Sequence, residues 1–315
     1  MGAKLGQNFL TDPNILRKII ALTVPDATQT VVEVGCGDGI LTRALLDTAK
    51  KLYVIEIDET CITKTKENLL FPSGRGALPD ESLIAGAAPR NGIQRAEPFG
   101  TPDESSALPS SHPIFILGDV LEVGFQPVAL EDRPFRIIAN IPYYISAKFI
   151  ALCAAHKHDL TDVTLMLQWE FAKKLVSKPG ESGYTPLAIF AQMHFDIRLD
   201  FQVSRHCFRP APKVDSAIVT LTPKALPEDL VHDEGFFLFV KAVFWGRRKP
   251  LKSALHKSPY WTVKEGYVTH PIWEKMGSTR AEILSREQLL DTYRVLAPYL
   301  ERVVSFKRRE VLDLD

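Results

Sequence analysis

A short apolar run followed directly by a cluster of glycines is the feature that most constrains the fold of this chain. Residues 30–34, Thr-Val-Val-Glu-Val, have the length and composition of a buried strand. The sequence continues with Gly35-Cys36-Gly37-Asp38-Gly39, and apolar residues then recur at helical spacing from Ile40. Glycines in such a turn let the backbone approach a ligand closely, because no side chain intrudes and positive φ costs little. The pattern predicts a strand, a ligand-binding turn and a helix.

Acidic residues follow the next two predicted strands. The run 52–57 ends in Glu56-Ile57-Asp58, about 20 residues beyond the turn, where a carboxylate suits the two hydroxyls of a ribose. The run 114–117 leads into Gly118-Asp119-Val120, which places a carboxylate where an adenine amino group could donate to it. A helix cap is the structural alternative for Asp119. Nicotinamide and flavin enzymes share the turn and the first acid, although the spacing here is G-x-G-x-G and not G-x-G-x-x-G.

The tetrapeptide Asn140-Ile141-Pro142-Tyr143 is suited to methylation of the amino group of adenine. That nitrogen is a poor nucleophile, because its lone pair is delocalised into the ring. An Asn side-chain oxygen and the carbonyl of Ile141, held rigid by the following Pro, can accept hydrogen bonds from both amino hydrogens. Tyr143 offers a flat face on which an extruded base can stack. Taken alone, the four residues also fit a strand that ends in a proline turn with a buried tyrosine.

Together and in this order, these segments resemble one family, the small-subunit ribosomal RNA adenine dimethyltransferases of the KsgA group. Three further segments carry the resemblance, namely Leu5–Leu10, Phe208–Ser216 and Phe244–Lys249. It covers nearly the whole chain outside one insertion. The resemblance implies S-adenosylmethionine as methyl donor and two adjacent adenosines near the 3′ end of small-subunit ribosomal RNA as acceptors. Each adenosine would receive two methyl groups, on RNA within a pre-assembled small ribosomal subunit.

The resemblance also assigns roles to residues of the donor site. Three N-terminal residues would close over the donor, two glycines would pass beneath its methionine part, and two acids with their neighbours would hold its ribose and adenine. The N-terminal residues are Gln7, Asn8 and Leu10, and the glycines are Gly35 and Gly37. Glu56 with Ile57 would hold the ribose, and Asp119 with Val120 would hold the adenine. Asn140 would lie at the boundary between donor and acceptor. In the acceptor pocket, Asn140, Ile141 and Pro142 would orient the target amino group. Tyr143 would stack on the base, with Phe208 as a second aromatic wall.

Basic residues are concentrated in one segment, although 38 basic and 38 acidic residues leave no net charge. Between residues 235 and 264 there is no Asp or Glu, and aromatic residues are interleaved with Lys and Arg. We interpret this segment as a surface that tracks RNA phosphates. Its candidate contacts are Arg247, Arg248, Lys249 and Lys252. A solvated helix face beside a hydrophobic core is the alternative.

The order of predicted elements indicates an α/β fold. We expect a Rossmann-like methyltransferase sheet with helices on both faces over residues 1–224, closed by two antiparallel runs at 197–203 and 217–221. Helical periodicity from residue 225 predicts a small C-terminal all-α domain that binds RNA. Residues 71–113 are rich in Pro, Gly and Ser and predict a flexible insertion.

Several function classes do not fit the composition. Four widely spaced cysteines without C-x-x-C predict reduced thiols and no zinc or other metal site. No apolar run is long enough to span a bilayer, and the first residues lack a signal-peptide core, so we expect a soluble, cytoplasmic protein. We also expect a monomer. Two alternatives stay open, a large-subunit RNA dimethyltransferase of the macrolide-resistance type and a non-catalytic assembly or transcription factor on the same fold.

Overall fold

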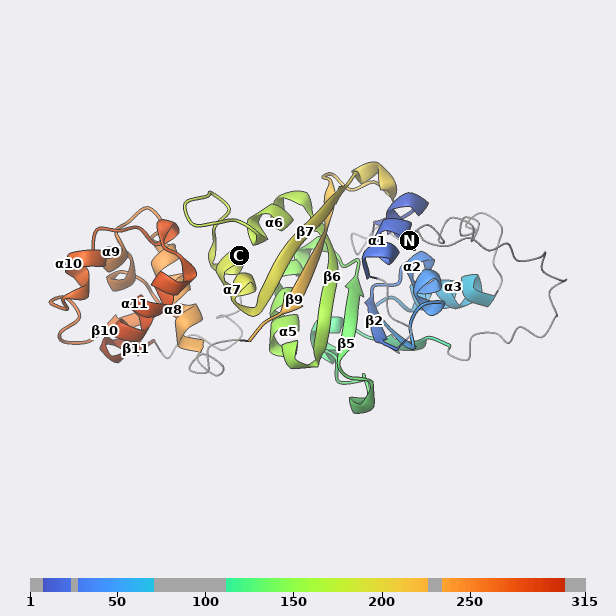
Figure 1. Ribbon diagram of the computed structural model, residues 1–315, viewed down its shortest axis with the longest axis horizontal. Helices are drawn as coiled ribbons and strands as arrows, with labels where there is room; N and C mark the ends of the chain where they lie inside the picture. The colour runs from blue at the N-terminus through green and yellow to red at the C-terminus, as the bar shows by residue number, and fades with distance from the viewer. Residues whose placement is uncertain (1–7, 24–27, 71–111, 226–233, 304–315) are drawn as a thin grey trace, which may run out of the picture.

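A seven-stranded sheet forms the centre of the computed structural model, which describes residues 8–23, 28–70, 112–225 and 234–303 (Figure 1). The strand order is β4-β3-β2-β5-β6-β9-β7. Six strands run parallel and β9 alone runs antiparallel between β6 and β7. The bounds are β2 Thr30–Val34, β3 Lys51–Glu56, β4 Ile114–Leu117, β5 Phe135–Ala139, β6 Leu160–Gln168, β7 Phe195–Val203 and β9 Ser216–Pro223.

Helices cover both faces of this sheet. On one face lie α1 (Pro13–Thr23), α2 (Ile40–Leu46) and α3 (Glu59–Leu70), which pack on one hydrophobic cluster. On the other lie α4 (Val120–Val123), α5 (Ser146–Ala155), α6 (Trp169–Leu175) and α7 (Pro186–His194), which pack on a second cluster. Because β2 is buried on both faces, its residues form an almost continuous apolar run. The prediction of a Rossmann-like sheet is confirmed.

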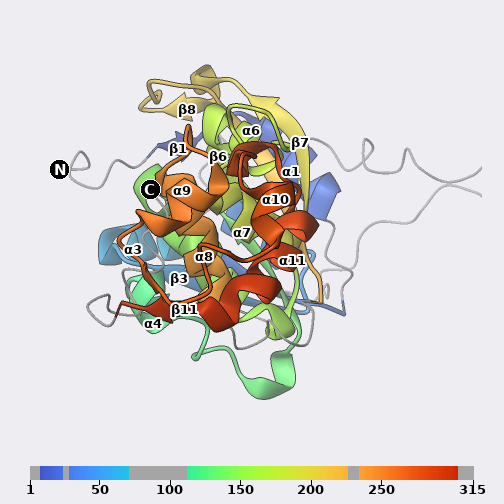
Figure 2. The same ribbon diagram turned by 90° about the vertical axis from the view of Figure 1, so that its left-hand side faces the viewer.

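The first helix has a local start signal, and the closing strands pair antiparallel as predicted. Asp12 caps α1, since its Oδ1 accepts from the backbone N–H groups of Asn14 at 2.8 Å and Ile15 at 3.1 Å. The loop between β7 and β9 carries the short strand β8 (Phe208–Arg209), which pairs antiparallel with β1 (Phe9–Leu10) (Figure 2). The N-terminal segment is thereby held beside the carboxyl edge of the sheet, where ligands of such folds bind.

The C-terminal part lies at one end of the molecule in Figure 1 and has its own hydrophobic cluster. Its helices are α8 (Glu234–Trp245), α9 (Leu251–His256), α10 (Ile272–Met276) and α11 (Arg286–Leu296). Ser285 and Gln288 form a capping box at the start of α11. The part is helical but not all-α, because β10 (Trp261–Val263) pairs antiparallel with β11 (Leu300–Arg302). That pairing joins segments far apart in the chain, so local periodicity does not reveal it.

The two parts share residues of one cluster. Tyr184 and Ile189, which precede the predicted boundary at 224/225, are buried with α8 and α11. The boundary itself stays a prediction. The predicted insertion lies outside the described residues except for its last two positions. Within the described ranges, no helix is long and apolar enough to cross a membrane.

Candidate active site

A cavity opens at the carboxyl edge of the parallel strands, where the fold predicts a ligand site. Its empty volume is about 880 Å³, counting space open to solvent, which suits a small-molecule site. It is lined by Asn8, Phe9, Val34, Gly35, Gly37, Ile55, Glu56, Ile57, Gly118, Asp119, Val120, Asn140, Ile141, Pro142, Tyr143, Tyr144 and Ile145. The ends of β2, β3, β4 and β5 all contribute, so the predicted donor and acceptor residues largely meet in one place.

The glycine turn after β2 forms one side of this cavity. Gly35 has φ +82° and Gly37 has φ +55°, a conformation that other residues rarely adopt. A Cβ on Gly35 would lie 2.9 Å from the carbonyl oxygen of Asn140, and one on Gly37 would lie 2.9 Å from the Phe9 ring. The turn therefore packs its backbone directly against both the β5 loop and the N-terminal segment.

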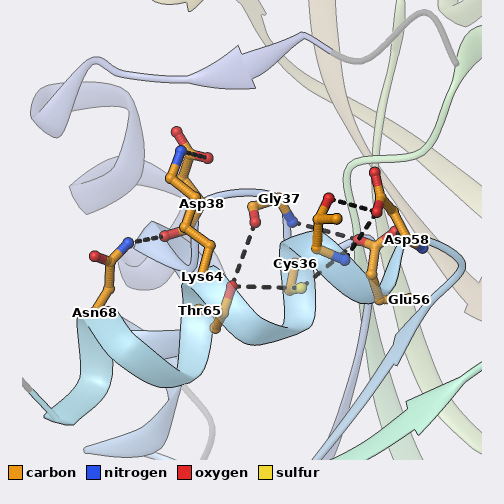
Figure 3. Close-up of polar contacts among 9 residues, drawn as sticks. Cys36, Gly37, Asp38, Glu56, Asp58, Lys64, Thr65 and Asn68 are labelled. Atoms are coloured by element: carbon orange, nitrogen blue, oxygen red, sulfur yellow. Dashed lines mark hydrogen bonds and ion pairs between the residues drawn. The ribbon is translucent and has the colours of Figure 1, made fainter. Parts of the chain in front are cut away.

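Glu56 ends β3 with its carboxylate buried beside the turn. One oxygen accepts from the backbone N–H of Gly37 at 3.4 Å and from the Cys36 thiol at 3.6 Å, and the other accepts from the backbone N–H of Asp58 at 3.0 Å (Figure 3). Burial raises the pKa of the Cys36 thiol, so this thiol stays protonated and can donate. Each carboxylate oxygen can accept more than one hydrogen bond, so Glu56 keeps capacity for hydroxyl groups in the cavity.

Asp119 lines the cavity and also caps a helix. Its Oδ1 accepts from the backbone N–H of Leu121 at 2.9 Å at the start of α4, which is the structural alternative raised by the sequence. The two roles are compatible, because a carboxylate has about four acceptor positions. Val120, the next residue, is buried against the cavity and opens α4.

Asn140 follows β5 and stands between the turn and the N-terminal segment. Its backbone N–H donates to Val34 at 3.3 Å, and its side-chain Nδ2 donates to the carbonyl of Asn8 at 3.4 Å. With Nδ2 engaged there, Oδ1 is the atom of this side chain that can accept from a group in the cavity. Ile141 is buried, and Pro142 begins the short turn of 3₁₀ helix that carries Tyr143.

Among the described residues, two that were predicted for the donor or acceptor site do not line this cavity. Leu10 and Phe208 are buried where β1 and β8 pair, and Leu10 lines a smaller neighbouring cavity behind the glycine turn. Phe208 is about 5% exposed and belongs to the cluster beneath α1, so it is not an open aromatic wall in this structure. Its acceptor role stays a prediction. Gln7 lies outside the described residues.

Two aromatic residues of the cavity were not singled out by the sequence. Phe9 lines it from β1, and Tyr144, 72% exposed, lines it beside Tyr143. Tyr144 could have been identified from its position next to the tetrapeptide, and Phe9 from its position within the N-terminal segment. Both add apolar surface next to the predicted stacking face.

The predicted RNA contacts divide into exposed and engaged side chains. Arg248 and Lys249 are exposed, and Lys249 lies over the exposed ring of Trp245. Arg247 instead turns back into the molecule. It pairs with Glu282 at 2.7 Å and donates to the carbonyl of Ser182 at 2.9 Å, bridging the C-terminal part to the loop before α7. Lys252 likewise donates to the carbonyl of Val268 at 2.6 Å.

A buried carboxyl group lies directly behind the glycine turn. Glu33 of β2 is fully buried on the face covered by α1–α3, and burial, reinforced by the charge of Glu56, raises its pKa to about 8. The Glu33 side chain is therefore mostly neutral in the folded protein near pH 7. Glu56, which lines the cavity, is the carboxyl group of this pair that a ligand can reach.

The described residues show no grouping of side chains typical of a metal site. Across the described ranges, no three His, Cys, Asp or Glu residues are grouped so that they could hold a metal ion. The four cysteines are free thiols, with Cys36, Cys61 and Cys153 buried and Cys207 half-buried. Burial raises the pKa of Cys153 as well, which favours an inert thiol.

Comparison with known proteins agrees with this geometry. The ribosomal RNA adenine dimethylase family matches residues 2–76 and 105–297. Ribosomal RNA small subunit methyltransferase A of Chlorobium chlorochromatii is 34% identical over 293 residues, which cover 93% of this chain and 92% of the relative. The protein of the same name from Levilactobacillus brevis is 33% identical over 248 residues, with 78% and 72% covered.

Solved structures show the same fold. A dimethyladenosine transferase from Plasmodium falciparum superposes with a TM-score of 0.67 at 24% identity, covering 92% of this chain and 98% of the other. The 23S rRNA methyltransferase ErmE superposes with a TM-score of 0.59 at 22% identity, covering 92% and 100%. At these identities the two structures speak for the fold alone. The family match spans both parts of the chain and all the segments that build the cavity, so the protein belongs to the ribosomal RNA adenine dimethylase family.

Proposed function

We propose that this protein transfers methyl groups from S-adenosylmethionine to the amino groups of two adjacent adenosines near the 3′ end of small-subunit ribosomal RNA. Each adenosine receives two methyl groups. The observation that carries the proposal is that one cavity holds the Asn140–Tyr143 tetrapeptide together with the glycine turn and the carboxylates Glu56 and Asp119. A donor with a ribose and an adenine fits the acids, and a flipped adenine fits the tetrapeptide.

The residues of the cavity suit the donor in their chemistry. Glu56 offers acceptor oxygens for ribose hydroxyls, and Asp119 offers one for an adenine amino group. Gly35 and Gly37 line the cavity, and no side chain of theirs intrudes on the methionine part. When bound, the donor supplies an electrophilic methyl group on a sulfonium, so the protein needs only to place the acceptor nitrogen in line with it.

The tetrapeptide supplies that placement. Asn140 Oδ1 and the carbonyl of Ile141 accept from the two amino hydrogens and draw the nitrogen toward tetrahedral geometry. Tyr143 stacks on the extruded base, which holds it against return to the RNA helix. The monomethylated base must bind again for the second transfer, and it still has one amino hydrogen for these acceptors.

The small subunit is the better candidate acceptor. Both relatives described above carry small-subunit methyltransferase in their names, at identities above 30%. We further propose that the acceptor is RNA in a pre-assembled subunit, since two exposed bases in a folded surface are read by shape. The enzyme would act as a monomer in the cytoplasm, where such subunits assemble.

Methyl transfer with labelled donor tests this proposal. Purified protein is offered small subunits that lack the modification, the same RNA free of protein, and protein-free large-subunit RNA. We expect strong incorporation into the subunits, and two methyl groups on each of two neighbouring adenosines by mass spectrometry. Preferential labelling of naked large-subunit RNA would support the macrolide-resistance type of enzyme. Donor binding without labelling of any RNA would support a non-catalytic role.

A further inference from the structure

A pair of hydroxyl groups links the acceptor loop to β9, which pairs antiparallel with β6 and β7 in the central sheet. The hydroxyl of Tyr143 and the Oγ of Ser216 lie 2.7 Å apart, a good hydrogen-bond distance for two hydroxyls. The two residues are 73 positions apart in the chain. The sequence had placed Ser216 only at the end of a family segment and had given it no role.

Ser216 is held from both sides. It is the first residue of β9, fully buried, and its Cα pairs with Gln168 of β6 and Val203 of β7. The preceding residue, Asp215, accepts from the backbone N–H of Trp169 at 2.9 Å. Because β9 runs against the parallel strands, its beginning lies at their carboxyl edge, on the side of the cavity. The Ser216 hydroxyl is therefore a fixed point at the ligand edge of the sheet.

Tyr143 has less support of its own. It sits in a single turn of 3₁₀ helix after Pro142, is only partly buried and lines the cavity. Burial raises the pKa of its hydroxyl, so the group is protonated at neutral pH and able to donate or accept. The contact with Ser216 fixes the far end of the ring, while the backbone fixes the near end. Two fixed ends set the position and direction of the long axis of the ring.

We propose that Ser216 is a positioning residue for the acceptor base, which it never touches. By holding the Tyr143 hydroxyl, it fixes the position of the ring on which the extruded adenine stacks. The inference rests on the proposed function, because it assigns Tyr143 the stacking role. The contact also joins the start of β9 to the tetrapeptide after β5, although β6 lies between β5 and β9 in the sheet (Figure 1).

Four proteins test the inference: wild type, Ser216→Ala, Tyr143→Phe and the double variant. Each single variant removes the same hydrogen bond from a different side and leaves the stacking ring in place. We expect each to raise KM for unmodified small subunits about tenfold, the size of one lost hydrogen bond, with kcat changed much less. The double variant should be no worse than either single one, since both remove one shared contact.

Controls separate positioning from loss of structure. Thr220 is also on β9, and its hydroxyl donates to Asp200 at 2.7 Å, away from the cavity. Thr220→Ala should lower the unfolding temperature without raising KM for small subunits. Donor affinity, measured by calorimetry, should be unchanged in all variants. Tyr143→Phe leaves β9 intact, so it keeps the test open if Ser216→Ala folds poorly.

Two results would overturn the inference. One is an additive double variant, which would mean that the two hydroxyls act independently. The other is an unchanged KM in Tyr143→Phe, which would mean that the hydroxyl does not set the ring. Failure of the proposed function gives a different result, because wild type itself would then not methylate small subunits.

Discussion

The sequence predicts functional residues both at the carboxyl edge of the sheet and in the basic segment 235–264. In the structure, the residues of the sheet edge meet in one place, whereas those of the basic segment do not. At the sheet edge, successive strand ends deliver Gly35, Glu56, Asp119 and Asn140 to one cavity. In the basic segment, neighbouring cations point to different places, with Arg248 exposed and Arg247 bound to Glu282. A parallel sheet fixes where strand-end residues go, whereas composition gives the charge of a segment and not the direction of each side chain.

The largest effect should come from the sheet edge. Asn140→Ala removes an acceptor that acts on the transferring nitrogen, so turnover should fall by about 10² or more with affinity for small subunits nearly unchanged. Single-turnover methyl transfer and filter binding measure the two quantities. Asn14→Ala, an exposed asparagine on α1, is the matched control. Activity of Asn140→Ala within threefold of wild type would remove this residue from the chemistry.

The basic segment should show a smaller and salt-dependent effect. Reversal of Arg248 and Lys249 to Glu should weaken binding of small subunits by about tenfold or more at low salt. The slope of log affinity against log salt should also fall by about one for each lost phosphate contact. Titrations at several salt concentrations give this slope, and donor affinity should not move.

Arg247 sharpens the comparison, because it carries the same charge in the same segment. Arg247→Gln breaks the contacts to Glu282 and Ser182, so it should lower the free energy of unfolding by about 1 kcal/mol. The salt slope should stay close to that of wild type. A slope reduced by about one, the change expected for one lost phosphate contact, would show that Arg247 contacts RNA after all.

Donor binding should depend on the carboxylate of Glu56 at the end of β3. Glu56→Ala should weaken binding of S-adenosylmethionine by roughly 1–3 kcal/mol, the size of a lost buried hydrogen bond to a charged group. Calorimetry measures it. Glu59→Ala, an exposed acid three residues further on and outside the cavity lining, provides the control. Equal affinities for both variants would place the ribose elsewhere.

Another expected effect concerns stability and pH. Folded Glu33 keeps its proton up to about pH 8, whereas an unfolded glutamate loses it near pH 4.5. Between these values the folded state binds the extra proton, so Glu33 makes the protein less stable as pH rises, by at most about 1.4 kcal/mol per pH unit. Urea unfolding of Glu33→Gln at pH 6 and pH 8 should show a weaker pH dependence than wild type. Glu131→Gln, at an exposed position, should behave as wild type does.

Sequence reasoning succeeded where local pattern determines position. The β2 strand and the glycine turn after it are both set by residues near one another in the chain. It could not foresee contacts between distant segments. The burial of Phe208 depends on its pairing with β1, and the partner of Arg247 lies 35 residues further on. The Tyr143 to Ser216 contact, across 73 positions, is of the same kind.

Primer extension on small-subunit RNA tests the central claim most directly, because two methyl groups on an adenine amino group block base pairing and stop reverse transcription. The RNA is taken from a strain without this gene and from the same strain carrying wild type or Asn140→Ala. The account predicts a stop at two adjacent adenosines near the 3′ end that is lost on deletion, restored by wild type and not restored by Asn140→Ala. A stop that persists in the deletion strain, or that Asn140→Ala restores in full, would contradict it.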